Sequence, residues 1–343
     1  MKAHIKIIRG VLKHMIDIYF EQDYGKLYEK HEKGKSESFD FKSVYGDIKH
    51  IFIKREISTL IDGELYYDII TPYGYGGPII LDYKEGCRDL LIKEYRENFQ
   101  KYCDNHNIVS EFVRFHPIEN NVYDFNHIYS TTHIRNTVGT NLEDFDNPFQ
   151  EEFSKSCRKN IRKALRNEVY YKVTEKPENI DKFMDIYYST MKRNNATHYY
   201  YFDQDYFNKC ISYFKENLLV VEAIYENKTI AMGLYFIYGD YIHIHLSGTI
   251  SEYLYLSPAY ILRYAVTEWG KENGYKTIHH GGGRTNEPND SLYKFKKQFG
   301  KNTDFEFHIG KKVWNEYVYG KLCEQKNVNE NIDFFPAYRF EGS

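Results

Sequence analysis

The order strand, glycine-rich turn, helix, strand occurs twice along the chain, and it constrains the fold more than any other feature. In the first copy, residues 47–57 and 64–71 have strand character and lead into a loop rich in tyrosine, glycine and proline at residues 71–79. A helical spacing of apolar residues follows (Leu90, Leu91, Tyr95 and Phe99) and closes near Asn105. Residues 108–115 are strand-like again, which completes one predicted α/β unit.

The second copy begins with a predicted β-hairpin over residues 230–247 that turns at Gly239. Ser257 is expected to cap the following helix, Pro258 to occupy its first turn and Gly274 to end it. Residues 275–280 form the next predicted strand. The recurrence predicts an α/β fold of two related domains with mixed sheets, residues 1–146 and residues 147–343.

A basic helix is predicted between the two copies. Asn147 and Pro148 are expected to start it, and its apolar stripe is Phe153, Cys157, Ile161 and Leu165. The rest of the helix surface is cationic and includes Arg158 and Arg162. These arginines are candidates for binding the phosphates of an acceptor or of a tRNA, and a solvated helix face is an equally good interpretation.

Composition limits the class of protein. The 343 residues carry a formal net charge of −3, which argues against DNA binding and leaves room only for a local polyanion site. Five scattered cysteines without a CxxC pair indicate reduced thiols and no metal site. Charged residues interrupt the first twenty positions, and no stretch approaches the ~20 apolar residues of a membrane span. We therefore expect a soluble, cytoplasmic protein.

The strand exit of the second copy is the strongest candidate site. Gly281, Gly282, Gly283 and Arg284 follow the last strand, and a short basic helix containing Tyr293 comes next. Glycines allow close backbone approach, and helix amides and lysines attract negative charge. The sequence predicts binding of an anionic or carbonyl-bearing ligand here.

Several separated motifs resemble the FemAB-like transferases. They are Thr-Val-Gly-Thr-Asn-Leu at 137–142, Cys-Arg-Lys-Asn-Ile-Arg-Lys-Ala at 157–164, and the three glycines with Leu-Tyr-Lys-Phe-Lys-Lys-Gln-Phe-Gly at 292–300. In the first domain, residues 75–79 resemble the family's Gly-Pro turn and residues 114–117 its Arg-x-x-Pro strand end. The resemblance implies two tandem GNAT folds (the acyl-CoA N-acyltransferase fold) and the addition of amino acids to peptidoglycan precursors, or acylation of other amines.

The chain departs from the family in features that concern its substrates. Gly76 stands where the family has a basic residue, so the contact of that residue with a nucleotide-linked acceptor cannot come from this position. The coiled-coil arm of some members is also missing. Residues 249–258 contain Glu252 and no glycine, which is poor chemistry for the pyrophosphate of coenzyme A. Acyl-CoA and aminoacyl-tRNA therefore both stay open as donor substrates.

Amide formation needs an oxyanion donor, a proton acceptor and positive charge near the donor. The resemblance implies that Lys296 balances negative charge on the donor and the oxyanion. Phe295, its neighbour in the family's Phe-Lys pair, fits the buried stripe of the short helix better than a site role. The alternative is that Lys296 lies on a solvated helix face and binds no ligand.

Proton transfer has several candidates. His243 and His245 are predicted to face one side of a strand together with Tyr241 and Ser247, and His245 is the candidate base. Structural histidines with satisfied hydrogen bonds are a commoner outcome. Tyr255 is a weaker candidate for protonating the leaving group, and Arg193 is expected on an acceptor-side helix.

The leading hypothesis is an N-acyltransferase that forms an amide on an amine acceptor without a covalent enzyme intermediate. The acceptor class is an amino sugar or peptide precursor, lipid- or nucleotide-linked, in cell-envelope or surface-glycan biosynthesis. A contrasting hypothesis is a non-catalytic protein that binds a glycan or peptide on a GNAT scaffold. RNA binding through residues 153–166 is the third possibility.

Overall fold

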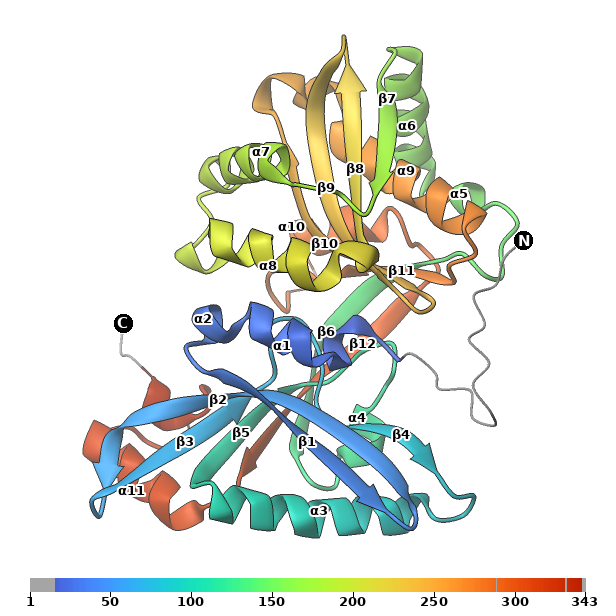
Figure 1. Cartoon of the computed structure of the whole chain (residues 1–343). Coiled ribbons are helices and arrows are strands. Elements are labelled where there is room, and N and C mark those ends of the chain that lie inside the picture. Colours follow the sequence, from blue (N-terminus) through green and yellow to red (C-terminus); the bar gives the residue numbers. More distant parts are fainter. Residues whose placement is uncertain (1–15, 288, 331, 341–343) are drawn as a thin grey trace.

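The computed structural model describes residues 16–287, 289–330 and 332–340, which form two stacked lobes (Figure 1). The lower lobe in Figure 1 contains β1 (Lys35–Ser43), β2 (Gly46–Ile61), β3 (Glu64–Ile70), β4 (Ile79–Tyr83), β5 (Ile108–Arg114), α3 (Arg88–Asn105) and α4 (Val122–Phe125). The short elements η1 (Ile18–Phe20), α1 (Gln22–Leu27) and α2 (Glu29–Glu32) precede β1. They pack against the upper lobe in one hydrophobic cluster.

The upper lobe holds the second set of strands and most of the helices. Its strands are β7 (Tyr170–Glu175), β8 (Leu218–Tyr225), β9 (Lys228–Tyr238), β10 (Tyr241–Thr249) and β11 (Thr277–Gly281). Its helices are α5 (Pro148–Glu151), α6 (Lys155–Arg166), α7 (Asp181–Arg193), η2 (His198–Tyr200), α8 (Gln204–Phe214), η3 (Lys215–Asn217), η4 (Ser251–Leu256), α9 (Pro258–Glu272) and α10 (Ser291–Lys297). Helices α7 and α8 cover one face of this half of the sheet, and α6 and α9 cover the other (Figure 1).

A single twelve-stranded sheet runs through both lobes. With β6 (Ser130–Asn141) and β12 (Asp304–Val313) included, its order is β1-β2-β3-β5-β12-β6-β11-β10-β9-β8-β7, and β4 pairs with β2. The pairs β3 with β5 and β10 with β11 are parallel, and the other named pairs are antiparallel. This mixed α/β sheet confirms the predicted fold class.

Two long strands connect the lobes. β6 (Ser130–Asn141) pairs with β11 of the upper lobe, and β12 (Asp304–Val313) pairs with β5 of the lower lobe. After β12 the chain stays in the lower lobe, where α11 (Glu316–Lys326) and η5 (Ala337–Arg339) pack against β2 and β5. Elements from the end of the chain, α11 and η5, therefore belong to the lobe that residues 16–146 mostly form. The division into domains at residue 146 stays a prediction.

Local sequence signals explain several boundaries. The β2–β3 hairpin turns at Asp62 and Gly63, both with positive φ, the conformation that tight hairpin turns require. Helix α3 ends at Asn105 as expected, but Leu90 is 46% exposed, and the buried stripe runs through Leu91, Ile92, Tyr95, Phe99 and Cys103. The β9–β10 hairpin turns at Gly239 and Asp240 as expected.

Three helix predictions need correction. The basic helix is two helices, because the Asn147 cap serves only α5 and the Ser154 side chain then caps α6. In α6, Leu165 is 38% exposed and Ala164 is buried in its place. Ser257 has a φ of +55° and makes no side-chain cap, although Pro258 and Gly274 lie at the start and just past the end of α9 as expected.

The five cysteines are all free thiols, in agreement with the expected reduced state. Among residues 16–287, 289–330 and 332–340, no helix has both the length and the apolar character needed to cross a membrane. The charged residues that interrupt the first twenty positions mostly lie outside this described part.

Candidate functional site

β10 and β11 part at the side of the upper lobe where β11 pairs with the connecting strand β6. Their parallel pairing covers Tyr241 to His243 against Thr277 to His279 and stops there. A β-bulge between Ile244 and Leu246 then shifts β10, so that Gly248 rather than Ser247 faces α7. Bulges of this kind re-aim side chains beside functional sites. Of the predicted site residues, Lys296 and the glycines after β11 lie beside these strand ends, and we call this place the opening between β10 and β11.

The glycine loop that follows β11 is folded around Asp290. The carboxylate of Asp290 accepts hydrogen bonds from the backbone N–H groups of Arg284 (3.0 Å), Thr285 (3.0 Å) and Tyr293 (2.7 Å). These bonds lower the pKa of Asp290 to about 2, with the Tyr293 amide as the largest cause. The expected cradle of free amides is therefore occupied at these three positions by the protein's own carboxylate.

Lys296 points back from α10 into the opening. Its Nζ donates to the carbonyl oxygen of Gly282 at 2.7 Å, and a Cβ at Gly281 would lie 3.3 Å from Nζ. Burial, as the largest cause, and the charges of Arg263 and Arg135 together lower the pKa of Lys296 to about 7, and the charge of Asp290 opposes them. An anion bound here would restore the charged form, because opposite charge favours protonation of an amine.

Arg263 was missed by the sequence analysis. It lies in α9 among buried apolar residues and is only 5% exposed, and its Nε and Nη1 have no hydrogen-bond partner in the described part of the chain. His280 on β11 also has an unpartnered Nδ1, while its Nε2 is 2.7 Å from the Thr140 hydroxyl. The Thr140 hydroxyl donates to Phe299 O, so His280 Nε2 is the donor to Thr140 and the Nδ1 of the neutral ring carries a lone pair. The two Arg263 nitrogens are buried donors, which are costly without an acceptor, so this side of the opening can hold a carboxylate or phosphate oxygen. In the sequence, an arginine within the apolar stripe of a predicted helix is the signal that could have identified Arg263.

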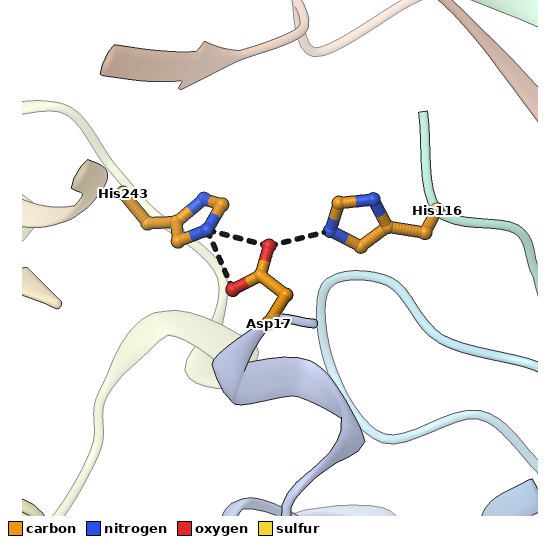
Figure 2. Close-up of side chains that lie close together, drawn as sticks. All are labelled: Asp17, His116 and His243. Carbon is orange, nitrogen blue, oxygen red and sulfur yellow. Dashed lines mark hydrogen bonds and ion pairs between the residues drawn. The ribbon is translucent and has the colours of Figure 1, made fainter. Parts of the chain in front are cut away.

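The opposite side of the opening carries a buried carboxylate between two imidazoles (Figure 2). Asp17 Oδ2 lies 2.8 Å from His116 Nε2 and 2.8 Å from His243 Nε2, and all three side chains are buried. Burial alone would raise the pKa of Asp17, but the attraction of His243 in its protonated form and hydrogen bonds from both imidazoles outweigh it and hold that pKa well below its usual range. Only His243 of the three stood out in the sequence.

Tyr75 and His279 join the two sides. The Tyr75 hydroxyl would lie 3.7 Å from a Cβ at Gly281, and its ring centroid is 5.2 Å from that of His279 and 5.9 Å from that of His116. Burial, followed by the charges of His243, His116 and Lys296, lowers the pKa of His279 well below its usual value. His279 is thus an uncharged residue at the centre of the site.

Several predicted residues make structural contacts instead. His245 Nε2 lies 2.5 Å from the Tyr206 hydroxyl, and burial lowers its pKa to about 3, so it stays neutral at ordinary pH. Arg193 Nη1 donates to Thr249 O and ties α7 to β10. Arg158 donates to the Gln150 and Phe153 carbonyls, a link between α5 and α6.

The remaining predicted residues lie at the edge of the site or away from it. Phe295 packs on Tyr260 and Phe299, which agrees with a core role. The Tyr293 hydroxyl donates to Asp304, and Arg284 is exposed. Arg162 lines a surface pocket on α6 with Lys155, Lys159 and Arg166, and Tyr255 is 66% exposed beside a second surface pocket. The structure does not bring these last two residues to Lys296.

Comparison with protein families gives a match to the acetyltransferase (GNAT) domain over residues 151–297. The matched segment contains α6 to α10 and both strands of the opening. This segment is similar to GNAT acetyltransferase domains. The expected enzyme class, an acyltransferase, is thereby confirmed. A comparison with curated proteins finds no match.

Solved structures extend the fold to the whole chain. The structure entitled "Crystal structure of FemX" superposes with a TM-score of 0.67 at 12% identity, over 89% of this chain and 94% of that one. The C-terminal domain of a putative lysylphosphatidylglycerol synthetase from Agrobacterium fabrum gives 0.55 at 12% identity over 90% and 92%. L-PGS from Bacillus licheniformis gives 0.51 at 12% identity over 90% and 95%. The tandem GNAT fold expected from the FemAB-like motifs is confirmed.

Proposed function

We propose that this GNAT-fold protein transfers an aminoacyl or acyl group from an activated ester or thioester to the amine of an amino sugar or peptide precursor in cell-envelope or surface-glycan biosynthesis. One observation carries the proposal: Lys296 Nζ lies at the parting of β10 and β11, half-buried, and has no acidic hydrogen-bond partner among the residues that the structure describes. A cation held in such a place favours a reaction in which negative charge develops on a carbonyl oxygen.

The two sides of the opening support different roles. On the α9 side, Arg263 and Lys296 supply positive charge and unpartnered donors, which suit the phosphates or carbonyl of a donor. On the lower-lobe side, Asp17 and the two histidines bound to it suit the acceptor amine, which must lose a proton. The direct attack of the amine on the donor needs no covalent enzyme intermediate.

Both donors expected from the sequence stay in the proposal. The GNAT match favours acyl-CoA, and the fold of the aminoacyltransferase-like neighbours favours aminoacyl-tRNA. The open basic pocket on α6 is available to the phosphates of either donor. The acceptor is proposed to be lipid- or nucleotide-linked.

The test is transfer of a labelled group by the full chain. Carbon-14 acetyl-CoA and carbon-14 alanyl-tRNA are each incubated with glucosamine, glycylglycine and a nucleotide-linked peptidoglycan precursor. Label that appears in a product resistant to neutral hydroxylamine identifies an amide, because esters and thioesters are cleaved. Transfer from one donor supports the proposal. If neither donor yields an amide while a glycan or peptide still binds, the protein is a binding module.

A further inference from the structure

The unpartnered Nδ1 of His243 points to a base beside the proposed transfer site. We propose that His243 Nδ1 accepts the proton of the attacking amine, and that Asp17 and His116 hold His243 in the tautomer that makes this possible. The inference rests on the proposed function, which it deepens by naming the proton acceptor. It replaces His245, whose Nε2 is engaged by Tyr206.

The tautomer of His116 follows from its backbone neighbour. The N–H of Glu119 donates to His116 Nδ1 at 3.0 Å, so Nδ1 carries a lone pair. The ring proton of a neutral His116 is therefore on Nε2, from which it is donated to Asp17 Oδ2 at 2.8 Å. His116 is fixed as a donor to the carboxylate.

The carboxylate in turn fixes His243. An ionised Asp17 only accepts hydrogen bonds, and Oδ1 already accepts from the Ile18 N–H at 2.6 Å. His243 Nε2 lies 2.9 Å from Oδ1 and 2.8 Å from Oδ2, so this nitrogen must carry a proton. Figure 2 shows the other ring nitrogen of His243 pointing away from Asp17.

That second nitrogen is the one left free. His243 is 2% exposed, and Nδ1 has no hydrogen-bond partner in the described residues. A proton on Nδ1 would make it a buried donor without an acceptor, whereas the neutral ring leaves a lone pair there. A buried imidazole with one nitrogen bound to a carboxylate and a free lone pair on the other is the arrangement of a general base.

The same three side chains also have the composition of a metal site, since one ligand atom from each lies within 4.8 Å of the others. The hydrogen-bond pattern argues against a metal. Both Nε2 atoms that face the carboxylate carry protons, so their lone pairs are not available to an ion. Bound zinc would require His116 to lose the bond from Glu119 or to become an imidazolate.

The base is assembled from three distant parts of the chain. Asp17 caps η1, His116 follows β5 of the lower lobe, and His243 is on β10 of the upper lobe. Tyr19 of η1 packs edge-on against His243, with ring centroids 4.9 Å apart. Docking of the segment before β1 between the lobes therefore orients the base.

The reaction balances without a cofactor. The amine nitrogen forms a bond to the carbonyl carbon, and the bond from that carbon to the donor sulfur or ribose oxygen breaks. The electron pair leaves on the sulfur or oxygen, and the amine proton moves to His243 Nδ1. The resulting imidazolium is stabilised by Asp17, and it returns the proton to the leaving oxygen or to water.

The tautomer is tested directly by NMR of the whole protein labelled with ¹⁵N-histidine. Couplings between ring protons and nitrogens are expected to show His243 and His116 protonated at Nε2 and not at Nδ1. In D17N the side-chain NH₂ faces one imidazole, so His243 is expected to change to the Nδ1–H form. A wild-type His243 protonated at Nδ1 overturns the proposal. So does stoichiometric zinc that shifts the His243 nitrogen signals.

Kinetics provides the second test. The donor is the one that is active in the transfer experiment, and the acceptor is glycylglycine. H243N and D17N are expected to lower kcat about 10²- to 10⁴-fold while leaving the KM of the donor unchanged. The matched control is H50N, because His50 is also buried and lies 3.1 Å from a carboxylate, Glu111, but sits in the core of the lower lobe. H50N is expected to lose stability and keep its kcat.

The outcomes separate the two proposals. A wild-type protein that forms no amide from either donor contradicts the proposed function. A wild-type protein that forms amide, with H243N equally fast, contradicts the role of His243 alone. Added imidazole that restores the rate of H243N supports that role, because a structural defect would not be repaired by a small base.

Discussion

The Nζ of Lys296 donates a hydrogen bond to the carbonyl oxygen of Gly282 at 2.7 Å, so the basic helix and the glycine exit of β11 are locked to each other. Arg135 adds a second bond of this kind, from Nη1 to the carbonyl oxygen of Gly283. The loop offers its carbonyls to cations while its amides bind Asp290. Lys296 is thereby positioned by a neutral carbonyl group and not by an acidic partner.

Lys296 should give the protein a stability that rises with pH. Its folded pKa of about 7 is below the unfolded value of about 10.5, so between these values the unfolded state binds more protons. The penalty is greatest below pH 7 and disappears as the pH rises toward 10.5. K296M is therefore expected to raise the free energy of unfolding at pH 7 more than at pH 9, measured by urea denaturation.

The control for this measurement is K294M, because Lys294 is exposed and bonds only Asn289 among the contacts described. K294M is expected to leave the pH dependence as in the wild type. Equal slopes for K296M and the wild type across pH 7–9 would contradict a lowered pKa of Lys296.

Asp290 should organise the site through hydrogen bonds more than through charge. D290N keeps an oxygen that can cap α10, whereas D290A removes the acceptor for three backbone N–H groups. D290A is expected to cost about 1–2 kcal/mol of stability and D290N clearly less. Thermal unfolding compares them, and an equal loss in both variants would show that charge is the decisive property.

Gly281 should tolerate no side chain for two separate reasons. Its φ of +73° costs an alanine about 1 kcal/mol, and the added Cβ would lie 3.3 Å from Lys296 Nζ. Gly63 is the matched control, since its φ is +82° and no atom lies within 4 Å of an added Cβ. G63A should lose stability only. G281A should lose stability and also transfer activity, and unchanged activity in G281A would place the site elsewhere.

Arg263 should weaken the fold in the absence of a ligand. Its buried guanidinium has two unpartnered nitrogens, and its charge is one cause of the low pKa of Lys296. R263M loses a hydrogen bond to Tyr235 but removes a buried charge, so a gain of about 1 kcal/mol is expected. Addition of the active donor should stabilise the wild type more than R263M in thermal shift experiments. A strongly destabilised R263M would contradict this account.

The repeated α/β pattern was enough to predict the fold class, because strand and helix periodicity is local. The hairpin at residues 239–240 and the end of α9 were predicted for the same reason. The crossing of β6 and β12 between the lobes was not predicted, because two strands more than a hundred residues apart carry no sequence pattern that shows their pairing. The helix break at Glu152 was hidden by an apolar spacing that continues across it.

The site was only half visible in the sequence. The glycines and Lys296 are adjacent in the chain and match a family motif, so they could be named. Asp17, Tyr75 and Arg263 come from three distant segments, and their meeting depends on the packing of the two lobes. The sequence alone does not separate His245 from His243, because both are predicted to face one side of the same strand. Only the contacts of His245 with Tyr206 and of His243 with Asp17 distinguish them.

The rate of a single turnover in K296M tests the central claim most directly. With the wild type, K294M and K296M each saturated with the active donor, the label that passes to glycylglycine is followed over time. We predict a wild-type rate for K294M and a rate at least about 10²-fold lower for K296M, with the donor still bound. Equal rates in all three proteins would contradict the assignment of Lys296 to the transfer site.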